Sequence, residues 1–145
     1  MNKLYISTRL IGTLVLVSLL SACSKDFLKS YDDRILGTWH VRGVNRVGFG
    51  GDSDRLPFRD GTFVFYEDGT LEYHRAGQGY SGTWDIEKRY YNDDDVVRIL
   101  KITAVNFNTQ QIISQYYDDM QFAGTDHFKA TVRTGFHTYV THFRR

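Results

Sequence analysis

The sequence predicts an all-β fold class, and within it a single up-and-down antiparallel β-barrel of about eight strands. Short runs rich in β-branched and aromatic residues recur from residue 35 to the end of the chain, which is the pattern of strands. Gly, Asn and Asp separate these runs, and the 145 residues include one proline. No apolar repeat of about 3.6 residues, the sign of an amphipathic helix, extends through this region. Strands joined by such short turns are expected to pair each with the next, and closing the sheet would remove its exposed edges.

Eight segments carry the strand pattern. They are 38–47, 61–67, 70–75, 82–88, 96–105, 110–117, 127–133 and 136–144. The pair Asp68-Gly69, between the second and third segments, is typical of a tight hairpin turn. Turn-forming residues at 92–95, 106–108 and 134–135 separate later strands, because Asn, Asp and Gly tolerate the backbone angles of turns. Additional residues at 118–126 blur the junction between the sixth and seventh strands.

One connection is long. Residues 48–60 form a glycine-rich stretch of about 13 residues, and loops of this length inside a compact domain are usually functional or disordered. We therefore expect this loop at one mouth of the barrel, where it is a candidate lid.

Alternation along the strands assigns aromatic residues to the interior. Trp39 and Val41 share one face of the first strand, and Phe63 and Phe65 share one face of the second, because side chains of a strand alternate between its two faces. An eight-stranded barrel is just wide enough to be filled by side chains or to hold one small ligand. The residues expected to line this lumen are Trp39, Val41, Phe63, Phe65, Tyr73, Trp84 and Tyr139.

The first residues predict an export signal. Lys3 and Arg9 precede an apolar run at residues 10–20, and small residues stand just before Cys23, the single cysteine of the chain. This is the layout of a secretory signal peptide. The run is shorter than the roughly 20 residues that a transmembrane helix needs. We therefore divide the chain into a signal peptide (1–22), a short polar tether (23–34) and a β-domain (35–145).

The four residues Leu20 to Cys23 resemble the lipobox of bacterial lipoproteins. The resemblance implies attachment of diacylglycerol to the Cys23 sulfur, cleavage just before this residue, and acylation of the new amino group, with palmitate among the acyl chains. A lipidated cysteine also accounts for an unpaired thiol in an exported protein, and more than one acyl chain gives stable membrane anchoring. The expected location is the bacterial cell envelope, most simply the outer membrane, with the periplasmic and outer faces both open.

A second resemblance concerns the β-domain. The chain contains "LGTW", "GTFVFYEDGTLEY", "SGTWDIE" and "ILKIT" in this order, and it ends in Phe143-Arg144-Arg145. This series resembles the small lipocalin-like (calycin-type) domains of Bacteroidota lipoproteins. The resemblance implies that Gly37, Trp39 and Arg144 close one end of the barrel, with the guanidinium of Arg144 or Arg145 within about 6 Å of the indole.

The charge balance and the polar residues exclude several functions. After loss of Lys3 and Arg9, 16 basic residues face 17 acidic ones, so no nucleic-acid partner is expected. His137 and His142 are five residues apart and lie on opposite faces of a regular strand, so they form no chelating pair. His40 and His142 would approach each other on the outside if the first and last strands pair. The sequence therefore predicts no metal site, no cofactor and no catalytic residues.

Two functions remain for a membrane-tethered protein of this kind. The first is binding of a small, largely hydrophobic ligand in the lumen or at the mouth of the barrel. The alternative is a packed barrel that docks an envelope protein partner through its loops. The volume of the lumen distinguishes the two, because a ligand site needs a cavity of about 300 Å³ or more.

Overall fold

A computed structural model describes residues 29–48, 56–91 and 95–145. The chain divides into two compact units, Met1–Arg34 and Ile35–Arg145, and the second is the range expected for the β-domain. The predicted signal peptide and the predicted lipidation site, Cys23, lie outside the described residues. No helix in the described part of the chain is long and apolar enough to span a membrane.

The short helix α2 (Tyr31–Ile35) occupies the end of the segment that the sequence predicted as a polar tether. Ser30 caps it, because the Ser30 hydroxyl accepts a hydrogen bond from the Asp33 backbone N–H at 3.1 Å. The same hydroxyl donates to the Asp33 carboxylate at 2.8 Å. A serine followed three residues later by an acid is a common way to begin a helix.

The second unit confirms the all-β prediction. Nine strands lie within the described residues, and all of their pairings are antiparallel. They are β1 (Gly37–Val47), β2 (Thr62–Phe65), β3 (Thr70–Arg75), β4 (Gln78–Tyr91), β5 (Asp95–Asn106), β6 (Gln111–Tyr117), β7 (Asp119–Phe122), β8 (His127–Thr134) and β9 (His137–Arg144).

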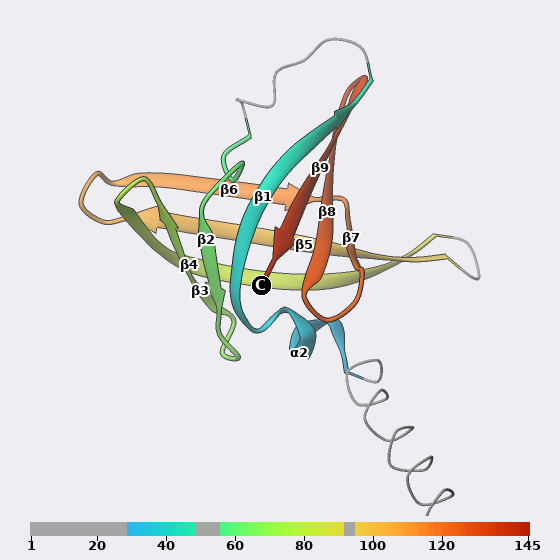
Figure 1. Ribbon diagram of the computed structural model, residues 1–145, viewed down its shortest axis with the longest axis horizontal. Helices are drawn as coiled ribbons and strands as arrows, with labels where there is room; N and C mark the ends of the chain where they lie inside the picture. The colour runs from blue at the N-terminus through green and yellow to red at the C-terminus, as the bar shows by residue number, and fades with distance from the viewer. Residues whose placement is uncertain (1–28, 49–55, 92–94) are drawn as a thin grey trace, which may run out of the picture. The chain divides into compact units, whose positions relative to one another are not determined.

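The strands form one sheet in the order β6-β5-β4-β3-β2-β1-β9-β8-β7. The expected pairing of the first and last strands is present, with Val41 opposite Phe143. The sheet curls so that β4, β5 and β6 cross behind β1, β9 and β8 (Figure 1). The core lies between these two parts of the same sheet.

The hydrogen bonds of the described strands do not form the predicted closed barrel of eight strands. The sheet is open, because its two end strands, β6 and β7, do not pair with each other in the described ladder. They follow one another in the chain with only Asp118 between them. At this residue the chain leaves β5 and joins β8, since the Asp118 N–H donates to the Thr131 carbonyl at 2.7 Å. The sequence pattern missed the short strand β7 in the region it had left undefined.

The predicted hairpin turn at Asp68-Gly69 is confirmed. Gly69 has a φ of 80°, which glycine adopts without steric cost. The Asp68 carboxylate accepts hydrogen bonds from the Thr70 N–H at 2.9 Å and from its hydroxyl at 2.6 Å. These bonds hold the pKa of Asp68 below its ordinary value.

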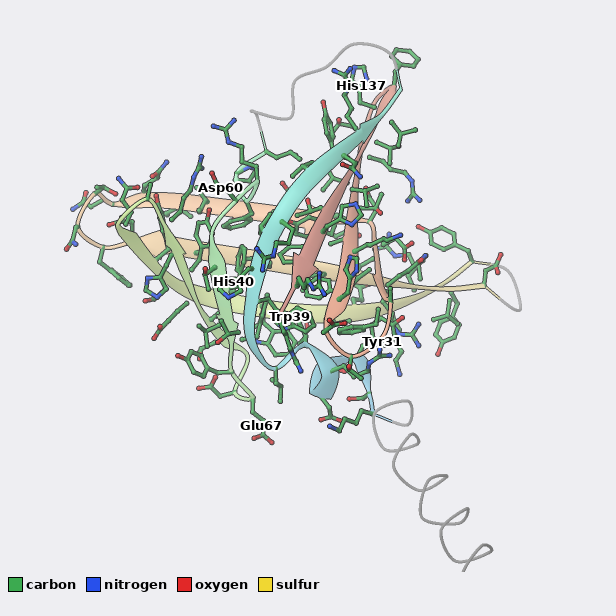
Figure 2. The ribbon with its side chains drawn as sticks, viewed as in Figure 1. Tyr31, Trp39, His40, Asp60, Glu67 and His137 are labelled. Carbon is green, nitrogen blue, oxygen red and sulfur yellow. The ribbon has the colours of Figure 1, made fainter. Side chains whose placement is uncertain are left out.

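Inward side chains alternate with outward ones along most strands. Trp39 and His40 are consecutive on β1, and Trp39 is buried whereas His40 is exposed (Figure 2). The second Gly-Thr-Trp of the sequence places Gly82 where β4 approaches β5 closely. A Cβ atom at Gly82 would lie 1.9 Å from the Thr103 carbonyl oxygen, so no larger residue fits there without backbone movement.

The described part of the long loop differs from the expected lid. Phe58 is 1% exposed, and its ring packs edge-on against Phe63 and Tyr73 at centroid distances of 5.3 and 5.0 Å. Phe58 therefore belongs to the core, and residues 49–55 of the predicted lid lie outside the described residues.

Candidate functional site

The residues predicted to line a lumen lie mostly in the core. Five of the seven are at most 5% exposed: Trp39, Phe63, Phe65, Tyr73 and Tyr139. Val41 and Trp84 are partly exposed. The Trp84 ring lies against Phe65 at 5.7 Å, and its indole N–H donates to the Tyr66 carbonyl at 3.0 Å.

The buried rings contact one another across the interior. Phe63 stacks on Tyr73 at 4.6 Å and meets Phe143 edge-on at 5.7 Å. Phe143 in turn stacks on Phe128 at 4.3 Å and contacts Tyr117 at 6.2 Å. Ring centroids at these distances are typical of aromatic pairs in contact, so these side chains pack against one another in the interior.

Trp39 closes one end of this interior. Its indole N–H donates to the Ile35 carbonyl at 2.6 Å, and its ring meets Phe128 edge-on at 4.7 Å. The Arg145 guanidinium lies 4.3 Å from the ring centroid, as expected for one of the last two arginines. The named candidate, Arg144, has a different place, because its guanidinium lies 3.6 Å from the Asp126 carboxylate. Gly37, at the start of β1, has a φ of 100°, which explains a glycine there.

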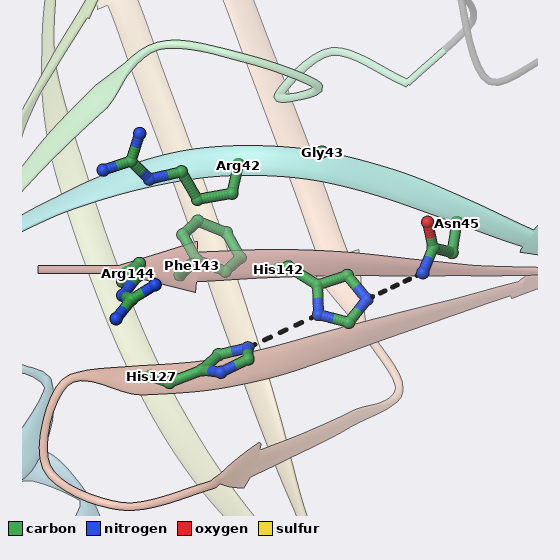
Figure 3. Close-up of a pocket in the computed structure, with 7 residues that line it drawn as sticks. All are labelled: Arg42, Gly43, Asn45, His127, His142, Phe143 and Arg144. Carbon is green, nitrogen blue, oxygen red and sulfur yellow. Dashed lines mark hydrogen bonds between the residues drawn. The ribbon is translucent and has the colours of Figure 1, made fainter.

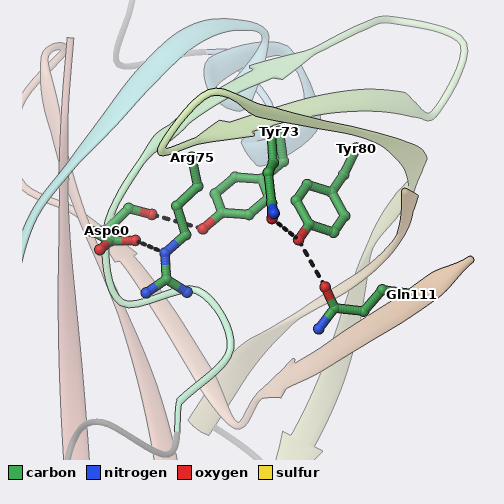
Figure 4. Close-up of polar contacts among 6 residues, drawn as sticks. Asp60, Tyr73, Arg75, Tyr80 and Gln111 are labelled. Atoms are coloured by element: carbon green, nitrogen blue, oxygen red, sulfur yellow. Dashed lines mark hydrogen bonds and ion pairs between the residues drawn. The ribbon is translucent and has the colours of Figure 1, made fainter. Parts of the chain in front are cut away.

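A polar network lies beside the buried rings of β3 and β4 (Figure 4). The Tyr73 hydroxyl donates to the Asp60 carbonyl at 3.0 Å, and the Asp60 carboxylate pairs with Arg75 at 2.6 Å. The Tyr80 hydroxyl lies 2.9 Å from the amide oxygens of Gln78 and Gln111. Burial raises the pKa of Tyr73 to about 12. The Tyr73 phenol is therefore a neutral group, and both phenols form hydrogen bonds that stabilise the structure.

The outer face of β1, β9 and β8 carries a hollow of about 290 Å³ (Figure 3). Its polar lining comes from three strands: Arg42 and Asn45 on β1, His142 and Arg144 on β9, and His127 on β8. We call it the outer pocket. Its polar side chains on β8 and β9 lie on the opposite face of the sheet from the aromatic core, because they alternate with the buried Phe128 and Phe143; Phe143 also borders the pocket.

Two irregularities of β1 form the outer pocket. The register between β1 and β9 shifts between Val41 and Gly43, so Arg42 is an extra residue in a β-bulge. Such a bulge redirects a side chain relative to the regular alternation. Gly43 then pairs with His142, and no heavy atom lies within 4 Å of where its Cβ would be. The missing side chain leaves the surface open beside the imidazole.

His142 is the centre of the outer pocket. Its Nε2 lies 3.1 Å from the Asn45 amide nitrogen and its Nδ1 lies 3.4 Å from His127 Nε2 (Figure 3). Burial, and then the nearby charges of His127 and Lys129, lower the pKa of His142. The imidazole is therefore mostly neutral at neutral pH, and Nδ1 carries the proton if the Asn45 amide donates to Nε2.

The sequence predictions did not identify this pocket. His40 was expected close to His142, but the partner of His40 is the Thr62 hydroxyl at 2.9 Å, and His142 instead contacts His127 and Asn45. Side chains alternate along each strand, so pairing of the last two strands could have placed His127 and His142 on the same face of the sheet. The bulge at Arg42 has no local sequence signal. No group of three or more His, Cys, Asp or Glu residues in the described part of the chain could hold a metal ion.

No known protein-family model, characterised protein or solved structure matches this chain. The function therefore has to be argued from the geometry of the molecule itself.

Proposed function

We propose that this protein is a lipid-anchored, non-enzymatic binding module of the bacterial envelope that engages its partner through its outer surface and loops. The observation that carries this proposal is the filled interior, in which Phe58, Phe63, Tyr73, Phe128 and Phe143 pack ring against ring. A small hydrophobic ligand in the lumen, the other function that the sequence suggests, would have to displace these rings. Interiors packed at normal density resist such displacement.

The fold type that belongs to this proposal is a lipocalin-like barrel. Its support is the Gly37-Thr38-Trp39 motif at the start of β1, with the Arg145 guanidinium over the indole. The bent segment 111–122 would be the eighth strand of the ring, joining β5 on one side to β8 on the other. The lumen of such a barrel is narrow enough to be plugged by side chains.

The test of the filled interior uses an apolar probe. The purified protein should bind neither benzene nor a fluorescent fatty-acid analogue saturably. Phe63→Ala, checked for folding by circular dichroism, should gain benzene binding, because a dry apolar cavity of sufficient size takes up such molecules. Saturable binding of either probe by the unaltered protein, or native mass spectrometry that finds a retained apolar molecule, would contradict the proposal.

The anchor is tested separately at Cys23. Cells grown with an alkyne-bearing palmitate should label the protein, and Cys23→Ser should lose the label. The variant should also leave the lipid-anchored membrane fraction or remain as an uncleaved precursor. Undiminished labelling of Cys23→Ser would place the acyl chains elsewhere or refute the lipoprotein assignment.

A further inference from the structure

The outer pocket brings several cationic groups together with little opposing charge. Arg42 and Arg144 line it, and Lys129 pairs with His142 across the β8–β9 ladder, so its side chain leaves the same face of the sheet. Asp126 lies 3.6 Å from Arg144, with both side chains largely exposed. Such an exposed ion pair is weak. No ion pair between Arg42 and another described residue is formed.

The two imidazoles add donors that depend on protonation. His127 and His142 lie with ring nitrogens 3.4 Å apart, so a second positive charge on the pair is unfavourable when no anion is present. An anion in the outer pocket would offset the repulsion between two protonated imidazoles. It would also offset their repulsion from the positive charges of Arg42, Lys129 and Arg144. Both histidines could then donate N–H groups, because protonated imidazole carries two donors.

We propose that the outer pocket binds a compact oxyanion, and that a phosphoryl group is the ligand whose chemistry fits it best. Arginine guanidinium groups bind phosphate oxygens through two parallel hydrogen bonds. A phosphate monoester carries nearly two negative charges at neutral pH and has a second pKa near 6, so it can share a proton with a neighbouring imidazole. A carboxylate has less charge for the same set of donors. The hollow of about 290 Å³ leaves room for part of the molecule that bears the phosphoryl group.

This inference rests on the proposed function, because it assigns ligand chemistry to the outer surface. Its experiment is independent of the interior, however, because it measures the NMR signals of the histidines in the outer pocket and uses neither of the apolar probes. A chain that binds no benzene and no phosphate would support the filled interior and refute the phosphoryl site. A chain that binds phosphate and also holds an apolar molecule would support the phosphoryl site and refute the filled interior.

The experiment is a histidine-selective NMR titration of the full chain in an uncharged detergent. Sodium phosphate is added at a pH near 6 and compared with sodium chloride at equal ionic strength. The resonances of His127 and His142 should shift with saturation, and the pKa of His142 should move back towards its ordinary value. His74, on β3, is an internal reporter of folding and should not shift.

Matched variants identify the groups involved. Arg42→Gln and Arg144→Gln should each weaken phosphate binding about tenfold, since a hydrogen bond to a charged group is lost. Arg133→Gln removes a cation from the same face of β8 but outside the outer pocket, and it should leave binding unchanged. An equal loss in Arg133→Gln, or shifts in chloride as large as those in phosphate, would show general screening and overturn the proposal.

Two further titrations identify the source of the phosphoryl group. Glycerol 3-phosphate represents the headgroup of a membrane lipid, and inorganic phosphate represents the free ion. Tighter binding of one or the other supports the site and names the source. Acetate that binds as tightly as both would overturn the choice of a phosphoryl group.

Discussion

The two faces of β9 differ in chemistry although their residues alternate along one strand. The inward residues Tyr139 and Phe143 are buried, and the Phe143 ring contacts partners from β2, β6 and β8. The outward residues His142 and Arg144 line a hollow and have few partners. The inner aromatic residues are already packed against neighbouring side chains. The outer face has hydrogen-bond donors and positive charge that remain available.

The comparison predicts where substitutions change stability. Burial of a large aromatic side chain contributes about 1.5–3 kcal/mol, whereas exposed polar groups contribute little individually. We therefore expect inward changes to lower the stability of the folded protein markedly, and outward changes to alter binding with small effects on stability.

The largest effect is expected at Trp39. Trp39→Ala should lower the free energy of unfolding by about 3–5 kcal/mol, because it leaves a cavity beneath Phe128 and Arg145. Arg145→Ala should cost about 0.5–1 kcal/mol, and the double variant should lose less than the sum because the two groups touch. Urea unfolding followed by circular dichroism measures all three. His40→Ala, one residue away on the outer face, should stay within about 0.5 kcal/mol of the unaltered protein. An equal loss of unfolding free energy in the Trp39 and His40 variants would contradict the distinction between the inward and outward faces of β1.

A smaller but still large effect is expected at Phe58. Phe58→Ala should cost about 3 kcal/mol, since it removes a ring packed on Phe63 and Tyr73, and the melting temperature reports it. Phe136, in the β8–β9 turn, is 97% exposed, and Phe136→Ala should have almost no effect. An unchanged melting temperature for Phe58→Ala would mean that residues 56–60 lie loosely on the surface.

The smallest effect is a pH dependence from the outer face. Since the pKa of His142 is lowered, the unfolded chain binds a proton at this residue more readily than the folded chain does. Its contribution to stability is therefore complete above the ordinary histidine pKa of about 6.5 and decreases as the pH falls below it. His142→Asn should flatten the pH dependence of the urea midpoint between about pH 7 and 5.

Phe136→Ala, a change at a residue that is 97% exposed and carries no titratable group, is the control for this measurement. It should keep the pH dependence of the unaltered protein. A His142→Asn variant with an unchanged slope would mean that the imidazole is as solvated in the folded chain as in the unfolded one.

Much of the fold could be predicted because strand periodicity is a local property. Seven of the nine observed strands lie within a few residues of predicted segments at both ends, since alternation and turn residues act over two to six positions. The exceptions are β4, which extends from Gln78 to Tyr91, and the short β7. β4 extends beyond its apolar residues because β5 supplies a backbone partner along its length.

The candidate site could be predicted only in part. The basic residue over Trp39 was expected from the end of the last strand, and it is Arg145. The outer pocket was missed, because it requires the register shift at Arg42 and the proximity of His127 and His142. Neither follows from residues that are neighbours in the chain.

By itself the sequence determined the all-β class, the position of most strands, the hairpin at Asp68-Gly69 and the inward direction of Trp39 and Phe63. These depend on alternation and on the backbone preferences of a few adjacent residues. Only the tertiary structure decided that Phe58 enters the core, that the chain bends at Asp118, and that Gly43 leaves an opening beside His142. Each of these depends on which distant strands meet and in which register, and that is set by the packing of the whole sheet around its rings.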